Sequence, residues 1–459
     1  MSRGAFPDGR MASRAPRFER YLDVVPTFRL SPEALASIAI MALSLTILIG
    51  TLGALVFILS TLALAAYDPA RSLQNIARYS PFLILPILAV LSTFWSTSPA
   101  ATMRGSLELF ITVVAMILMV CNMRASRMIL CVFIAHFIIC LIILPSVPHS
   151  LSSGNALYVG WLGSKNQVGS CGVMLAAMAM PVMIDKTQPF LARLSTLIAL
   201  PMSLLIIYLA QSGGSITSMV LMLVVFPPLA ALTLIKFPLR VGLVIFTLGM
   251  LAVCSFFIDD ITNAIVNFRV NVLNKDATLT GRTYLWDFAA RLSANHPYLG
   301  TGFNAFWQQG NIEAEGLWRW GGIANRSGFN FHNAFVGMRV YLGLVGLILL
   351  ILTCVCVTLA GLFRQLWKPS IPIAGLLSML AVNYAKSFVE EGLLNAFSLI
   401  TVLWLATGVY AFRPAADSKN NNEPVSFGRG VNRKRVSEKF GAREAAHLRS
   451  GDRPFRMVE

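Results

Sequence analysis

A histidine and an arginine stand at the start of a long apolar stretch in the C-terminal third of the chain. His332 precedes an apolar run over 334–346 that contains Arg339, Gly343 and Gly346. At 100° per residue, the offsets of 7, 11 and 14 from His332 place all four on one stripe of a helix. An imidazole that is neutral at about pH 7 can accept a proton. His332 is therefore a candidate base at the rim of this helix, and the alternative is an interfacial or hydrogen-bonded histidine without a chemical role.

Arg339 lies about two turns deeper on the same predicted stripe. A cation is expensive to place in lipid, so Arg339 should face the interior of a helix bundle or a wet cavity, and a residue in such a place is a functional candidate. The alternative is a structural ion pair with Glu390 or Glu391, which stand between two later apolar stretches.

A second polar set lies in 258–331, a long connection between apolar stretches. Arg282 could bind a diphosphate through two parallel hydrogen bonds, or it could simply be solvated. The residues after it predict an amphipathic helix that ends in a Pro- and Gly-rich turn at 296–302. The indoles of this connection could form an interfacial belt or platforms for sugar rings. They are Trp286, Trp307, Trp318 and Trp320.

Two weaker signals precede other apolar stretches. Ser164 is a candidate N-cap, and Lys165 beside that helix N-terminus would make an anion-binding corner. The polar segment 210–215 is more typical of a turn than of a site. The sequence contains no Walker loop, Rossmann glycine pattern, metal-ligand cluster or Asp-x-Asp motif. It therefore predicts no bound metal and no nucleotide-sugar donor.

The composition indicates a membrane protein. Apolar residues make up 56% of the 459 residues, charged residues 13%, and the mean hydropathy is +0.68. So few charges cannot cover a water-soluble surface. The net charge of +16 sits in the two tails and in short connections, where the positive-inside rule explains it without a nucleic-acid partner. The seven cysteines fall in apolar segments and predict no disulfide framework.

The apolar stretches predict an all-α polytopic protein of about twelve transmembrane helices. The first stretch, 34–67, would measure about 50 Å as one helix against a hydrocarbon core of about 30 Å, so two spans hinged near Gly50 and Gly53 are expected. The further expected spans are 81–95, 105–121, 128–145, 166–184, 194–211, 216–235, 240–257, 333–361, 371–388 and 393–412.

Charge predicts the orientation. Every second connection carries a basic pair, so both termini should be cytoplasmic and 258–331 should lie outside. The basic tail should be disordered and should contact anionic membrane lipids. The pairs are Arg71/Arg78, Arg124/Arg127, Lys186/Arg193, Lys236/Arg240 and Arg364/Lys368. The predicted parts are a cytoplasmic segment 1–33, helices 1–9 in 34–257, a periplasmic loop 258–331, helices 10–12 in 332–412, and the cytoplasmic tail 413–459.

Five segments in this order resemble the O-antigen ligase and Wzy-type polysaccharide polymerase superfamily, especially its exopolysaccharide polymerase branch. The resemblance covers about residues 35–412. The segments are 91–96 with Pro99 and Arg104, 164–166, Gly281 and Arg282 with Trp286, 296–302, and His332 and Asn333 with Gly343 and Gly346.

The resemblance implies a GT-C-like fold in the bacterial inner membrane. It implies a cofactor-free and metal-independent transfer of glycan, at the periplasmic face, from an undecaprenyl-diphosphate-linked oligosaccharide to a growing polysaccharide acceptor. His332 would be the catalytic base and Arg282 the diphosphate ligand. Lys165 and Arg339 would be supporting cations, and Trp286 would contact substrate. A flippase and a chain-length regulator are the expected protein partners.

Two alternatives to a polymerase stay open. One is an O-antigen ligase that transfers glycan to lipid A core. Many ligases carry a Ser-Arg pair where this chain has Ser-Gly-Gly at 212–214, which favours the polymerase. The other is a transporter or flippase of lipid-linked or anionic solutes. The polar features cluster at one membrane face and no internal repeat is evident, which favours an enzyme.

Overall fold

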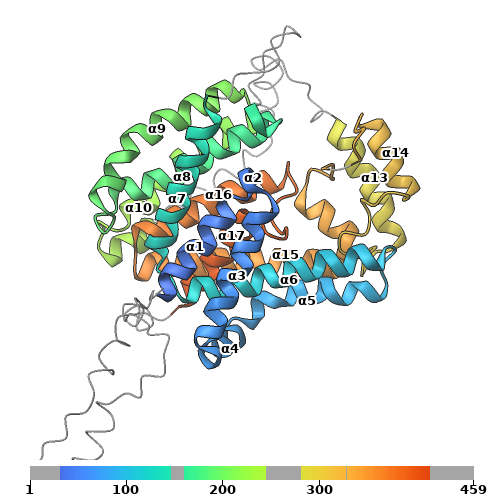
Figure 1. Ribbon diagram of the computed structural model, residues 1–459, viewed down its shortest axis with the longest axis horizontal. Helices are drawn as coiled ribbons and strands as arrows, with labels where there is room; N and C mark the ends of the chain where they lie inside the picture. The colour runs from blue at the N-terminus through green and yellow to red at the C-terminus, as the bar shows by residue number, and fades with distance from the viewer. Residues whose placement is uncertain (1–30, 146–159, 244, 246–280, 327, 414–459) are drawn as a thin grey trace, which may run out of the picture. The chain divides into compact units, whose positions relative to one another are not determined.

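The computed structural model describes residues 31–145, 160–243, 245, 281–326 and 328–413 (Figure 1). The expected N-terminal segment, the basic tail, most of the span expected at 240–257 and residues 258–280 of the expected loop lie outside the described residues. By its internal contacts the chain divides into two compact units, and one of them runs over 32–421. The helices and sites below belong to that unit.

Within the described ranges the unit is helical and contains no β-strand. The α-helices before the first long gap are α1 (Pro32–Ser44), α2 (Thr46–Ile49), α3 (Thr51–Tyr67), α4 (Pro69–Arg78), α5 (Ile84–Leu91), α6 (Pro99–Cys121) and α7 (Ala125–Ile143). Those after it are α8 (Lys165–Ile184), α9 (Phe190–Ala210), α10 (Gly213–Ala231), α13 (Arg282–Asn295), α14 (Ile312–Trp320), α15 (Ala334–Trp367), α16 (Ile371–Ser387) and α17 (Leu399–Phe412). Short 3₁₀ turns lie at Ser80–Leu83, Ser92–Phe94 and Gly160–Leu162.

Six helices in the described part are long and apolar enough to cross a membrane: α6, α7, α8, α9, α10 and α15. The number rises to seven if α3 and α4, which are bent by 110° between them, form one span. The apolar helices α1, α17 and the 80–94 stretch are shorter. The all-helical polytopic class is confirmed, whereas the number of about twelve spans stays a prediction.

The first apolar stretch is interrupted at one of the two glycines where a hinge was predicted. Gly50, with a φ of +57°, ends α2 and precedes α3, and α1 packs against α3. The Cα of Gly53 lies so close to the carbonyl of Ala42 that a Cβ would collide with it. The expected hinge is therefore confirmed, because only a residue without a side chain allows this close approach.

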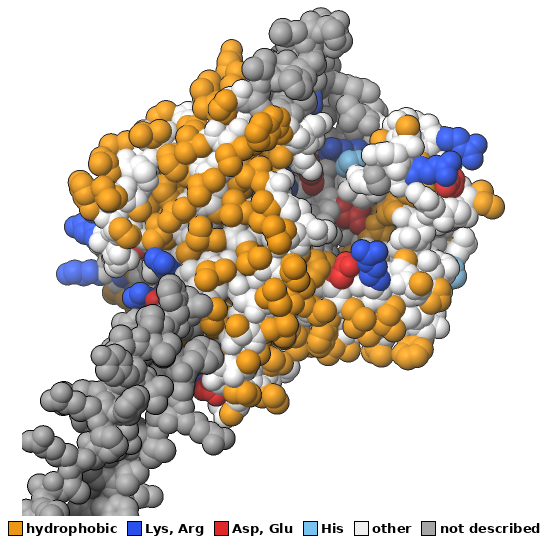
Figure 2. Space-filling view, in the orientation of Figure 1, with side chains coloured by type: hydrophobic (Ala, Val, Ile, Leu, Met, Phe, Trp, Pro, Cys, Tyr) orange, Lys and Arg blue, Asp and Glu red, His pale blue; other side chains and the backbone are white. Residues whose placement is uncertain are grey.

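The helix α8 is the centre of one group of helices, since α7, α9, α10 and α16 all pack against it. The helix α15 packs against α5, α13, α16 and α17. In Figure 1, α13 and α14 lie on the right, beside the ends of α5 and α6. Hydrophobic side chains cover much of the face over the remaining helices in Figure 2. A hollow beside the α13 and α14 region of that face gathers acidic, basic and histidine side chains.

A break in α15 connects this helix to the loop that follows α13. Gly343 has φ +63° and ψ −158°, which interrupts the helix. The backbone of residues 297–302 lies in the break and forms hydrogen bonds with the amides and carbonyls of α15 that lose their helical partners there. The bonds are Leu344 N to Pro297 O at 2.9 Å, Val345 N to Tyr298 O at 3.1 Å, Thr301 N to Val340 O at 2.9 Å and Gly302 N to Tyr341 O at 2.9 Å. Such compensation is what a broken membrane helix requires.

Candidate functional site

His332 lies outside the helix on which its stripe was predicted. The helix α15 begins at Ala334, and the side chain of Asn333 caps it by accepting hydrogen bonds from two amides of the first turn. His332 has a φ of +51°, and its amide donates to Oδ1 of Asn330 at 2.8 Å. The predicted stripe is therefore wrong, because the histidine precedes the cap and Gly343 interrupts the helix. Positive φ at a non-glycine residue is uncommon and concentrates at functional sites.

The imidazole of His332 sits half-buried beside a cation. The ring of Phe329 meets it edge-on, with centroids 5.5 Å apart. Burial lowers the pKa of His332, the positive charge of Arg282 lowers it further, and the negative charge of Glu390 opposes them. The ring is thereby kept in its neutral form, which is the form that can accept a proton.

Glu391 holds the segment that carries His332. It lies in the connection between α16 and α17, and its Oε2 accepts a hydrogen bond from the amide of Phe331 at 3.0 Å. Its carboxyl group also hydrogen-bonds with the hydroxyl of Tyr341, and Gly337 leaves no room for a Cβ beside it. Burial raises the pKa of Glu391 to about 7, although both hydrogen bonds favour the ionised form.

Two indoles brace the same segment. Nε1 of Trp286 donates to the carbonyl of Phe331 at 2.9 Å, and Nε1 of Trp307 donates to the hydroxyl of Tyr341 at 3.0 Å. The rings of Trp307 and Phe331 pack with centroids 5.0 Å apart. Trp286 therefore contacts the backbone next to His332, a role that its residue type alone did not indicate.

The other two tryptophans of this region differ from each other. Trp318 is buried and packs against Trp307 with centroids 6.0 Å apart. Trp320 is 47% exposed and packs against Tyr284 at 4.8 Å. Of the four indoles only Trp320 is exposed, whereas Trp286, Trp307 and Trp318 are partly or wholly packed into the fold.

Arg282 is the first residue of α13, so it lies at a helix N-terminus, where the helix dipole adds positive potential. Gly281 before it has a φ of +78°, and its Cα packs against the ring of Trp320, where a Cβ would collide. Arg282 and His332 are 50 residues apart in sequence, yet the charge of one acts on the pKa of the other. The fold thus brings the predicted base and the predicted diphosphate ligand together.

Lys386 is a cation that the sequence analysis missed. It lies in the last turn of α16, and its Nζ donates to Oγ of Ser170 on α8 at 2.9 Å. Glu390, whose charge acts on His332, also interacts electrostatically with Lys386. A charged residue within an apolar stretch was the criterion that singled out Arg339. The same criterion applied to 371–388 could have identified Lys386.

Lys165 is the first residue of α8 and is half-buried. Ser164 occupies the N-cap position, but its side chain forms no capping hydrogen bond, so the predicted capping role is wrong. Asn166 accepts a hydrogen bond from Oγ of Ser212 at 2.9 Å, which ties the starts of α8 and α10 together. The turn expected within 210–215 is confirmed at Gln211, which has a φ of +46° between the end of α9 at Ala210 and the start of α10 at Gly213.

Arg339 is exposed and lies on a different face of α15 from its buried neighbours Met338 and Val340. The prediction that it faces the bundle interior is therefore wrong, whereas a position in a wet cavity stays a prediction. Within the described part of the chain it forms no ion pair, so the alternative, a structural pair with Glu390 or Glu391, is wrong as well.

Known proteins match the part of the chain that carries these residues. Residues 197–351 match the O-antigen ligase family, and this range includes Arg282, His332 and Arg339. The chain is also 28% identical over 345 residues to the exopolysaccharide production protein ExoQ of Rhizobium meliloti (strain 1021), covering 73% of this chain and 78% of that protein. The resemblance to the O-antigen ligase and Wzy-type superfamily, in its exopolysaccharide branch, is confirmed.

Proposed function

We propose, from this confirmed resemblance, that the chain is a glycosyltransferase that polymerises undecaprenyl-diphosphate-linked oligosaccharide repeat units into exopolysaccharide. The observation that carries the proposal is the pairing of His332 with Arg282. A half-buried neutral imidazole lies within the electrostatic reach of a permanent cation, and both residues fall in the matched range. The match to ExoQ, named as an exopolysaccharide production protein, favours a polymerase.

The proposed reaction is a single displacement at the anomeric carbon. The hydroxyl oxygen of the acceptor sugar forms the new bond to that carbon, and His332 takes the hydroxyl proton. The bond between the anomeric carbon and the diphosphate oxygen breaks, and undecaprenyl diphosphate leaves with the electron pair. Arg282 stabilises the charge that develops on the leaving group. The proposed reaction needs neither metal nor cofactor.

Further cations complete the proposed site. Lys165 and Arg339 support donor binding, and Lys386 supplies a cation near Glu390 in a chain that lacks an arginine at 212–214. Trp286 contributes through Phe331 by positioning His332. Glu391 has the same positioning role from the other side of the segment.

The proposal includes a location and a topology. The active face is periplasmic, the chain is a multi-pass inner-membrane protein with a GT-C-like fold, and both termini are cytoplasmic. The alternation of basic pairs supports this orientation. A flippase that delivers the lipid-linked repeat unit and a chain-length regulator are the proposed partners.

A ligase is the second candidate, because the matched family is described as O-antigen ligase. An assay with purified protein, lipid-linked repeat units and no other acceptor separates the candidates. A polymerase gives a ladder of products, whereas a ligase gives a product only when lipid A core is added. A flippase would move the lipid-linked unit across the membrane of proteoliposomes without forming a new glycosidic bond. Such transport without any new bond would contradict the proposal.

A further inference from the structure

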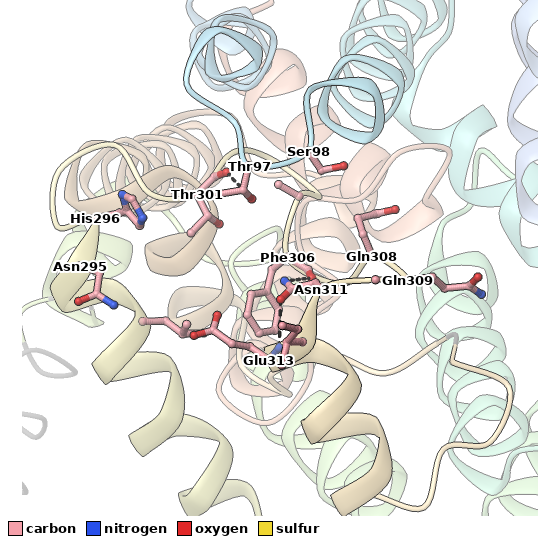
Figure 3. A pocket seen from close by; sticks show the side chains of 14 residues that line it. Thr97, Ser98, Asn295, His296, Thr301, Phe306, Gln308, Gln309, Asn311 and Glu313 are labelled. Atoms are coloured by element: carbon pink, nitrogen blue, oxygen red, sulfur yellow. Dashed lines mark hydrogen bonds between the residues drawn. The ribbon is translucent and has the colours of Figure 1, made fainter.

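A polar cavity of about 520 Å³ lies at the opposite end of α13 from Arg282 (Figure 3). Its lining comes from the end of α13, the loop and first turn that lead into α14, and residues 97 and 98 ahead of α6. Figure 3 shows Asn295 and His296 on one side, with Thr97 and Ser98 across the cavity from Glu313. The volume falls within the range of small-molecule sites.

Some lining residues build the cavity. The backbone amide and hydroxyl of Thr97 both donate to the carbonyl of Thr301, at 2.9 and 3.3 Å. Asn311 donates to the carbonyl of Phe306 at 2.8 Å and accepts from the amide of Glu313 at 3.1 Å. The Thr97 contacts join segments 204 residues apart, and the Asn311 contacts fix the loop ahead of α14, so the walls are held in place before any ligand binds.

Other lining side chains have unused hydrogen-bonding capacity. Within the described ranges, no side-chain hydrogen bond is formed by Ser98, Asn295, His296, Gln309 or Glu313. Hydroxyl and amide groups can both donate and accept, which matches the hydroxyls of a sugar. The exposed side chain of Ile312 adds an apolar surface to this lining.

The charge of the lining selects against an anion. The described residues that line the cavity include neither Lys nor Arg, and their one carboxylate is Glu313. A diphosphate would therefore be repelled here and attracted to Arg282. The helix α13 has 14 residues and so separates the two places by about 21 Å.

We propose that this cavity is a saccharide-binding subsite that holds uncharged sugar residues of the glycan away from the reacting diphosphate. The inference rests on the proposed function, which places the diphosphate at Arg282. The cavity would then hold sugar units remote from the bond being made. Sugars from two sources have this chemistry, namely the growing acceptor and the non-reducing part of the lipid-linked donor.

The test is a direct binding measurement on the full chain in lipid nanodiscs. The probe is a set of lipid-free oligosaccharides, prepared by partial hydrolysis of the exopolysaccharide from cells that produce the wild-type chain. The double variant Asn295→Ala/Glu313→Ala removes two unused groups without touching the core. Loss of two hydrogen bonds should weaken probe binding by about tenfold to one-hundredfold.

The matched control is Gln74→Ala/Asp287→Ala, which removes an amide and a carboxylate that are exposed and do not line the cavity. It should bind the probe as the wild type does. A second probe, a prenyl diphosphate without sugar, should bind the cavity variant and the wild type equally. Unchanged oligosaccharide binding by the cavity variant, equal loss in the control, or no binding by the wild type would overturn the subsite.

Competition identifies which sugar occupies the cavity. If an excess of the lipid-linked repeat unit displaces the lipid-free probe, the donor glycan occupies the subsite; if both bind together, the acceptor does. The subsite and the proposed function fail in different ways. A wild-type chain that binds the oligosaccharide through Asn295 and Glu313 but makes no polymer would contradict only the proposed function.

Discussion

The backbone amide of Phe331 donates a hydrogen bond to Oε2 of Glu391 at 3.0 Å, across 60 residues of sequence. This contact fixes the residue immediately before His332, whose own backbone has a positive φ. A strained conformation persists only where its surroundings hold it, and Glu391 is one of the groups that do so. In the proposed reaction Glu391 thus positions His332 and does not itself react.

Replacement of Glu391 should separate its acceptor role from its charge. Glu391→Ala leaves the amide of Phe331 without its acceptor, which costs about 1–3 kcal/mol and should reduce turnover strongly. Glu391→Gln keeps an acceptor oxygen and should retain more activity. Turnover by the two variants and their thermal unfolding in detergent are the measurements. Equal loss in both would contradict the hydrogen-bonding role.

The raised pKa of Glu391 also predicts a pH dependence of stability. Because its pKa rises from 4.5 to about 7 on folding, the folded state prefers the protonated carboxyl group. This contribution is fully present below pH 4.5 and is lost as the pH rises through about 7. The melting temperature of the wild type relative to Glu391→Gln should therefore fall over that window. A difference that is the same at every pH would refute the assignment.

Replacement of His332 should remove proton abstraction and spare donor binding. His332→Ala should lower the rate of polymerisation by a factor of about 100 to 10,000. Polymer formation and binding of the lipid-linked donor are measured separately on the folded variant. Polymerisation at the wild-type rate would exclude His332 as the base, and complete loss of donor binding would make it a ligand or a structural residue instead.

Two neighbours of His332 should move the acid limb of the pH–rate profile in opposite directions. Arg282 lowers the pKa of His332 and Glu390 raises it. Arg282→Gln should therefore shift the limb to higher pH, and Glu390→Gln should shift it to lower pH. Arg282→Lys keeps the charge, so it should leave the limb in place while weakening donor binding through loss of the two-pronged contact. If both substitutions shifted the acid limb in the same direction, a group other than His332 would be responsible for that limb.

The break in α15 should tolerate no side chain at Gly343. A Cβ there would collide with the backbone of Tyr298, and the positive φ adds strain of about 1–3 kcal/mol. Gly343→Ala should therefore lower the melting temperature and detach 297–302 from the helix. Gly242→Ala is the control, because a Cβ at Gly242 meets nothing within 4 Å. Equal melting temperatures for the two variants would show that the close approach is unimportant.

Chelation of divalent ions should leave polymerisation intact. The proposed reaction assigns proton transfer to His332 and charge stabilisation to Arg282, so it requires no metal. The measurement is polymer formation by the purified chain with EDTA, with and without added Mg²⁺ or Mn²⁺. Loss of activity in EDTA that a divalent ion restores would count against the whole mechanism.

The sequence by itself determined the class of the protein and its candidate residues. Apolar runs of membrane length predict helices wherever they occur, since the chain must satisfy its backbone internally in lipid. The break at Gly50 was predictable because a single helix would exceed the bilayer thickness. Short motifs identified Arg282 and His332 and the superfamily, because they depend on residue types and not on packing.

Only the tertiary structure decided how these residues are held. The predicted stripe through His332 assumed an uninterrupted helix. In the structure Asn333 caps α15, so the helix begins only after His332. Gly343 then breaks α15 at the place where 297–302 supply hydrogen bonds. The roles of Glu391 and Lys386 rest on partners 60 and 216 residues away. Local periodicity carries no information about such partners, because a buried polar group bonds to whichever group the fold brings near it.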